Sequence, residues 1–120
     1  MRVAAAVLAA ALLAPAAATA ATPAKVFPNR VQVVAQEFFF ALSRHSVPAG
    51  PAIVELVNFG QDAHDLRVQR VGARHIAGTP VVQAGGRAEL MLTLRPGRYR
   101  FWCSLADHRA RGMSATLVVR

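Results

Sequence analysis

The sequence is poor in cysteine, and Cys103 is the only one among its 120 residues. A single thiol cannot form a disulfide within the chain, and it cannot supply the roughly four thiolates that an iron–sulfur cluster requires. No cysteine lies near the amino terminus, which excludes a bacterial lipoprotein anchor. A lone thiol is most often a buried, inert side chain, so any other role for Cys103 must come from the residues around it.

Long apolar runs are missing as well, and the one short run lies near the amino terminus. Arg2 precedes an apolar stretch at residues 3–13 that is too short to span a bilayer. Ala18-Thr19-Ala20 then has the small-x-small pattern of a cleavage site, and Pro15 argues against a buried helix or an uncleaved anchor. These features predict three segments: a signal peptide at residues 1–20, a linker at residues 21–30 and one domain at residues 31–120. We expect an exported monomer without a membrane span, in the periplasm or, without an outer membrane, outside the cell.

Acidic residues are scarce, with 6 Asp and Glu against 14 Lys and Arg, and the formal net charge is +8. Such an excess of positive charge can attract an acidic partner, although the acids are too interspersed to leave one basic stripe. No nucleic-acid-binding motif accompanies the charge, and export also argues against a nucleic-acid partner. No Ser-His-Asp order, phosphate-binding loop or pair of carboxylates indicates an enzyme.

Helical periodicity is absent too, because no stretch after residue 21 keeps a helical period for three turns. Short runs of alternating apolar and polar residues are separated by Gly and Pro turns, which is the pattern of an all-β protein. The predicted strands lie at about residues 31–41, 52–58, 63–71, 80–83, 88–94, 97–102 and 114–119. About seven strands in a domain of this size predict a β-sandwich.

What the sequence does contain is a regular series of potential metal ligands after its single cysteine. His108 follows Cys103 after four residues, and Met113 follows His108 after four more. A thiolate, an imidazole and a thioether form a soft ligand set, and a thiolate with a weak axial Met is typical of blue-copper electron-transfer sites. Such a site needs a second imidazole, which His64 is well placed to supply. This spacing favours a metal ligand over an inert buried thiol at Cys103.

The Cys-x4-His-x4-Met loop between two strands, with His64 upstream, resembles the ligand loop of the cupredoxins, the blue-copper proteins that include plastocyanin and azurin. The segments Val47–Pro51, Val54–Asn58 and Ala63–Leu66 also resemble small bacterial members of that family, so the resemblance covers about residues 31–120. It implies a Greek-key β-sandwich. It also implies one copper ion at an end of the sandwich, beneath loop 104–112 and near loop 59–63.

The alternation of strand residues agrees with this arrangement. Tyr99, Phe101 and Cys103 share one face of the strand that precedes the loop, because successive side chains of a strand point to opposite faces. By the same parity, His64 shares a face with Leu66. Both ligand candidates are therefore expected to point inward at the ends of strands.

Zinc is the rival metal for a set of one Cys and two His. It prefers four nitrogen, sulfur or oxygen ligands and rarely binds a thioether, so Met113 favours copper. A binuclear copper centre would need a second, bridging cysteine. The predicted cofactor is one mononuclear copper that alternates between Cu(I) and Cu(II).

Two further residues are expected to support the ligands. Asp65 follows His64, and Ser104 follows Cys103. In the resembled family, an Asn typically takes the place of Asp65 and ties the two loops together by hydrogen bonds. A carboxylate can accept a hydrogen bond from Ser104 but cannot donate an amide proton. An exposed Asp65 without such a role remains the alternative.

The expected function is one-electron transfer between redox partners outside the cytoplasm. In the resembled family, the histidine that corresponds to His108 lies nearest to solvent within a ring of apolar residues. A redox protein is expected to dock on residues of this loop, namely Leu105, Ala106, Arg109, Ala110 and Arg111. The two arginines favour a partner with an acidic surface. An enzyme is not expected, because four protein ligands leave no open position for a substrate. The alternatives are an exported protein that carries, stores or buffers copper, and a domain that binds no metal.

Overall fold

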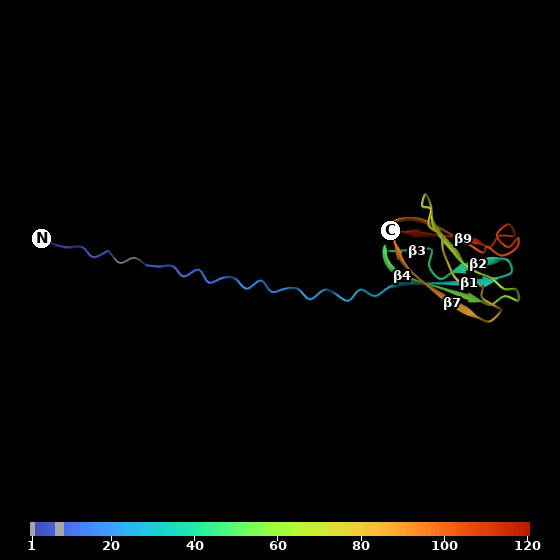
Figure 1. Cartoon of the computed structure of the whole chain (residues 1–120), viewed down its shortest axis with the longest axis horizontal. Helices are drawn as coiled ribbons and strands as arrows, with labels where there is room; N and C mark the ends of the chain where they lie inside the picture. Colours follow the sequence, from blue (N-terminus) through green and yellow to red (C-terminus); the bar gives the residue numbers. More distant parts are fainter. Residues whose placement is uncertain (1, 7–8) are drawn as a thin grey trace.

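The structure is a computed structural model that describes residues 2–6 and 9–120. Residues 1, 7 and 8 of the expected signal peptide lie outside the described residues. Residues 2–6 and 9–28 contain no helix or strand, and they form the extended tail in Figure 1. Nine strands follow within the described part of the chain. In that same part, no helix has the length and apolar character needed to cross a membrane.

One layer of the sandwich is a four-stranded sheet. It contains β1 (Asn29–Gln36), β2 (Phe39–Leu42), β4 (Gly50–Asn58) and β7 (Arg87–Leu94), in the order β2-β1-β4-β7. β1 pairs with β4 in parallel, and the two outer pairs are antiparallel. Because β1 and β4 run side by side in the same direction, the segments that follow them emerge at the same end of the molecule (Figure 1).

The second layer is a five-stranded sheet with the order β3-β9-β8-β5-β6. Its strands are β3 (Ser46–Val47), β5 (Arg67–Arg70), β6 (Ala77–Gly78), β8 (Gly97–Trp102) and β9 (Ser114–Val119). β8 and β9 form an antiparallel hairpin, and residues 103–113 connect them. The prediction of an all-β sandwich is confirmed.

The prediction of about seven strands is too low, since the structure has nine in the described residues. The single strand predicted at 31–41 is two strands, because the chain turns at Glu37 and Phe38 so that β1 pairs with β2. β3 and β6 are two residues long, which is too short for an alternating pattern to reveal. The strand predicted at 80–83 is reduced to one isolated bridge between Val82 and His64. The strand predicted at 63–71 is shorter, because only Arg67–Arg70 continues the ladder with β8.

The core lies between the sheets and is built from alternate residues of each strand. In β8, Tyr99 and Phe101 are buried while Arg98 and Arg100 are exposed. Each large apolar side chain that folding removes from water stabilises the sandwich by about 1.5–3 kcal/mol. This face of β8 continues directly into Cys103, which is fully buried. The sandwich thus fixes the position of the thiol through its hydrophobic core.

Candidate metal centre

Cys103 lies immediately after β8, at the end of the five-stranded sheet, and none of its surface is exposed. Its backbone N–H donates to the carbonyl oxygen of Met113 across the mouth of the β8–β9 hairpin, at 3.2 Å. Burial raises the pKa of the Cys103 thiol above its ordinary value. A metal ligand must be the thiolate, so binding of a metal here displaces a proton from sulfur.

His64 approaches Cys103 from the segment that connects β4 and β5. It precedes β5 and is held by two backbone hydrogen bonds with Val82, at 3.0 and 2.7 Å. Its side chain is fully buried, and its Nδ1 atom lies 4.0 Å from Sγ of Cys103. His64 therefore presents one ring nitrogen to the sulfur from a fixed backbone.

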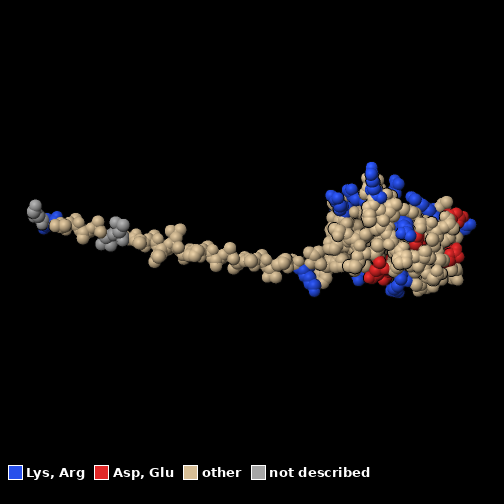
Figure 2. Space-filling model, viewed as in Figure 1, with Lys and Arg blue, Asp and Glu red and all other residues tan. Residues whose placement is uncertain are grey.

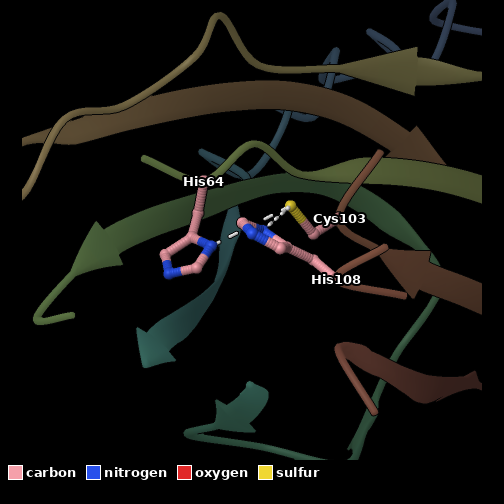
Figure 3. Close-up of side chains that lie close together, drawn as sticks. All are labelled: His64, Cys103 and His108. Carbon is pink, nitrogen blue, oxygen red and sulfur yellow. Dashed lines mark hydrogen bonds between the residues drawn. The ribbon is translucent and has the colours of Figure 1, made fainter. Parts of the chain in front are cut away.

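His108 lies in the loop between β8 and β9, where its N–H donates to the carbonyl of Leu105 at 3.1 Å. Its Nδ1 atom is 3.5 Å from Sγ of Cys103, and its ring centre is 5.0 Å from that of His64. Figure 3 shows the three side chains directed toward one another. At 8 %, His108 is the only one of the three with any exposed surface.

One sulfur and two imidazole nitrogens thus converge, with the ligand atoms all within 4.8 Å of one another. Met113, the fourth expected ligand, is fully buried at the end of the same loop, and its N–H donates to the carbonyl of His108 at 3.1 Å. Gly112 makes this turn with φ of +119°, a conformation that favours glycine, and a Cβ there would approach the backbone of Phe38. Thiolate and imidazole donors beside a thioether suit copper, and the cluster could bind one copper ion.

Asp65 connects the two segments that carry the expected ligands His64 and Cys103. Its carboxylate is buried and accepts hydrogen bonds from both the backbone N–H, at 2.7 Å, and the hydroxyl of Ser104. It also forms an ion pair with Arg67 at 2.9 Å. Burial works against ionisation of Asp65, but the hydrogen bonds from Ser104 and the charge of Arg67 outweigh it and lower its pKa. Asp65, which follows His64, thus binds Ser104, which follows Cys103, and it does so only as a hydrogen-bond acceptor.

Glu37, in the turn between β1 and β2, is a contact of the site that the sequence did not reveal. Its Oε1 atom accepts hydrogen bonds from the N–H groups of Gln61 and Asp62, at 2.8 and 2.7 Å, and lies 3.0 Å from Nε2 of His64. The hydrogen bond from Asp62 is the main cause that lowers the pKa of Glu37 to about 2. Glu37 is therefore ionised at neutral pH, behind the buried histidine.

The residues expected to dock a partner surround His108 but face different ways. Ala106, Arg109, Ala110 and Arg111 are exposed, whereas Leu105 is half-buried against the core. The guanidinium of Arg109 lies over the ring of Trp102, 4.6 Å from its centre, and that of Arg111 lies over Phe38 at the same distance.

The sequence matches the family described as "Cupredoxin-like domain" over residues 2–119. The chain belongs to the cupredoxin family. This match and the grouping of Cys103, His64 and His108 agree on a copper-binding domain of this fold. No curated protein sequence matches this cupredoxin.

Solved structures with the same fold include an auracyanin from Roseiflexus castenholzii, with a TM-score of 0.64 and 18 % identity over 77 % of this chain and 97 % of that one. Auracyanin A, a "blue" copper protein from Chloroflexus aurantiacus, has a TM-score of 0.59 and 12 % identity over 78 % and 100 % of the two chains. A multicopper oxidase matches with a TM-score of 0.57 and 17 % identity, over 76 % of this cupredoxin and 41 % of the oxidase. At these identities, the likeness concerns the fold.

Proposed function

We propose that this cupredoxin is a one-electron carrier that binds a single copper ion through His64, Cys103, His108 and Met113. The observation that carries the proposal is the buried convergence of one thiol and two imidazoles beside a buried thioether residue. The copper would supply the one-electron couple between Cu(I) and Cu(II). The protein supplies ligands that backbone hydrogen bonds and core packing already hold in place, so that little rearrangement accompanies a change of oxidation state.

Copper loading tests the metal site. The purified protein is titrated with Cu(II), and we expect one equivalent to bind and produce an intense thiolate-to-copper charge-transfer band. Zinc, titrated in parallel, should bind without colour and be displaced by copper. A protein that binds no copper, or binds it without this band, would contradict the proposed site.

Carriage or storage of copper is the competing function for the same site. An electron carrier exchanges electrons between its oxidised and reduced forms much faster than it loses the metal. We therefore expect line broadening in NMR spectra of mixed Cu(I) and Cu(II) protein to reveal rapid self-exchange. Transfer of copper to a chelator should be slow under the same conditions. Rapid copper loss with slow self-exchange would instead indicate carriage.

We propose that the redox partner docks around His108, on Leu105, Ala106, Arg109, Ala110 and Arg111. An acidic surface suits Arg109 and the five-stranded sheet beside the loop, while Arg111 pairs with Asp107 at 2.9 Å within the loop. The charged residues in the strands of that sheet are all basic, although Arg67 pairs with the buried Asp65. Its strands contain four arginines and no Asp or Glu: Arg67, Arg70, Arg98 and Arg100. The strands of the other sheet contain Arg30 and Arg87, which face Glu89 and Glu55 at 3.5 and 3.6 Å. Figure 2 accordingly shows basic side chains gathered along the upper side of the body.

The docking proposal is tested with small redox reagents of opposite charge, the hexacyanoferrate anion and the hexaammineruthenium cation. Reversal of charge in Arg109→Glu/Arg111→Glu should slow the reaction with the anion at low salt and flatten its salt dependence. The matched control is Arg30→Glu/Arg87→Glu, which makes the same change on the opposite sheet. Equal slowing by both pairs would show an effect of net charge alone and contradict docking at the loop.

We also propose that residues 1–20 are a signal peptide and that the mature protein acts outside the cytoplasm, in the periplasm of a cell with two membranes. The apolar stretch 3–13 and the small residues at 18–20 support this, as does a sandwich whose first strand begins only at Asn29. Mass spectrometry of the protein isolated from a cell envelope fraction tests it. The expected mature chain begins at Ala21.

A further inference from the structure

The contact between Glu37 and His64 determines which nitrogen of the imidazole carries a proton. An ionised carboxylate can only accept hydrogen bonds, so its approach to Nε2 of His64 at 3.0 Å requires a proton on that nitrogen. In a neutral imidazole, the lone pair then lies on Nδ1, which is the atom that faces Sγ of Cys103. The carboxylate thus selects the form of His64 that is ready to bind a metal.

Within the described part of the chain, His108 has no comparable contact. The nearest carboxylate to Nε2 of His108 is that of Asp62, at 3.9 Å, which is beyond hydrogen-bond distance. Asp62 is also half-exposed, whereas Glu37 keeps only 26 % of its side-chain surface in contact with solvent. The two imidazoles therefore differ in the carboxylate that lies nearest their Nε2 atoms, which is close and partly buried at His64 and more distant and solvated at His108. The third carboxylate near the site, that of Asp65, contacts Ser104 and Arg67.

We propose that Glu37 is a positioning residue that fixes the orientation and tautomer of His64 and, by its negative charge, favours Cu(II) over Cu(I) in the site. The effect on Cu(II) and Cu(I) rests on the proposed copper function, whereas the effect on the tautomer of His64 concerns the metal-free protein. Partners of this kind raise the basicity of a ligating imidazole, and their loss typically lowers metal affinity about 10- to 100-fold.

The loop beneath Glu37 has other supports, which allows Glu37 to be altered without unfolding the site. Asn58 is buried at the end of β4, and its amide donates to the carbonyls of Asp62 and Val82, at 2.7 and 2.9 Å. Its Oδ1 atom accepts from the N–H of Gly60 at 2.9 Å. Asn58 therefore holds residues 60–62 from the end of β4, while Glu37 contacts them from the turn between β1 and β2.

The first test uses metal-free protein labelled with nitrogen-15. In the wild-type protein, NMR should show a protonated Nε2 and an unprotonated Nδ1 at His64, with a slowly exchanging Nε2 proton. Glu37→Gln removes the charge but keeps an amide oxygen that can still accept from Nε2, so it serves the second test. In Glu37→Met, which keeps a similar size and removes both the charge and the acceptor oxygens, we expect that proton to exchange faster or the other tautomer to be populated. An unchanged tautomer and exchange rate in the folded variant would overturn the positioning role.

The second test measures the oxidation state of the copper-loaded protein at a fixed external potential. We expect Glu37→Gln to raise the ratio of Cu(I) to Cu(II) about tenfold, which corresponds to 59 mV for a one-electron couple. Glu55→Gln is the control for charge lost from β4 of the same sheet, and Asp62→Asn is the control near His108. If Asp62→Asn gives the same shift as Glu37→Gln, the effect is general electrostatics and the specific role of Glu37 is overturned.

A third variant covers the case in which Glu37→Met does not fold. Gly60 lies against the carboxylate, and a Cβ there would collide with both oxygens of Glu37. Gly60→Ala should therefore displace the carboxylate while leaving its charge in the protein, and it should speed exchange of the Nε2 proton as Glu37→Met does. If neither the tautomer nor exchange changes in folded Gly60→Ala, the proposal fails. If wild-type protein binds no copper, the proposed function fails while the metal-free test still decides the role of Glu37.

Discussion

His64 and His108 approach one sulfur atom from two regions that are built differently. His64 lies in the segment between β4 and β5, where Val82 holds its backbone, Glu37 contacts its outer nitrogen and no surface remains exposed. His108 lies in an eleven-residue loop whose ends are Cys103 and Met113, and its ring reaches the surface beside Phe38. His64 is thus a core residue with polar partners, whereas His108 belongs to a short loop that is fixed at both ends. One site thus combines a fully buried imidazole with one that reaches the surface.

Removal of the sulfur that both regions share has the largest expected effect. Cys103→Ser should abolish the charge-transfer band completely, because the chain has no other thiolate. It should also weaken Cu(II) binding more than any other single change, which a competition titration with a chelator measures. Ser104→Ala, at the neighbouring position, should retain the band. A coloured Cys103→Ser protein would show that the colour arises elsewhere.

The next largest effect should distinguish the two histidines directly. His64→Gly and His108→Gly each remove one imidazole, and free imidazole is then added to the copper-loaded proteins. We expect it to restore the spectrum of His108→Gly at low concentration, because that position opens to solvent, and to restore His64→Gly only at much higher concentration. Equal rescue of the two variants would show that the buried side is as accessible as the loop.

Asp65 joins the two regions, so its loss should separate them. Asp65→Ala leaves the backbone N–H of Ser104 and the side chain of Arg67 without their partner, which should lower the free energy of unfolding by about 2 kcal/mol. Urea unfolding of the metal-free protein measures this. Asp107→Ala is the control, because its exposed pair with Arg111 should contribute no more than about 0.5 kcal/mol. Equal losses would mean that Asp65 connects nothing essential.

The smallest effect is expected at Met113, which belongs to the loop region alone. Met113→Leu keeps the buried volume, so the colour should persist and the free energy of unfolding should change by less than about 1.5 kcal/mol. The reduction potential should rise, because Cu(II) loses more from removal of a weak donor than Cu(I) does. Voltammetry of the two proteins gives the shift. Loss of copper binding as complete as in Cys103→Ser would contradict a weak axial role.

The sequence predicted the parts of the site that lie close together in the chain or follow strand parity. Cys103, His108 and Met113 share one loop, and alternation along β8 places Cys103 on the core side, as in the structure. The sandwich followed from the alternating runs, but the two-residue strands β3 and β6 carry no pattern of their own. Glu37 could not be found, because it is 27 residues from His64 and lay inside what reads as one continuous strand. Only the turn between β1 and β2 directs its carboxylate toward the loop after β4.

The distance of His64 from the other ligands along the chain links the metal to folding. His64 precedes Cys103 by 39 residues, so the unfolded chain retains three of the proposed ligand residues in one short segment and leaves the fourth far away. Copper that binds only the native protein would stabilise it by about 4 kcal/mol at a free concentration 1,000 times the dissociation constant. Binding to Cys103, His108 and Met113 in the unfolded chain subtracts from that gain. Copper thus stabilises the native protein only to the extent that its affinity for the complete site, with His64, exceeds its affinity for the eleven-residue segment alone.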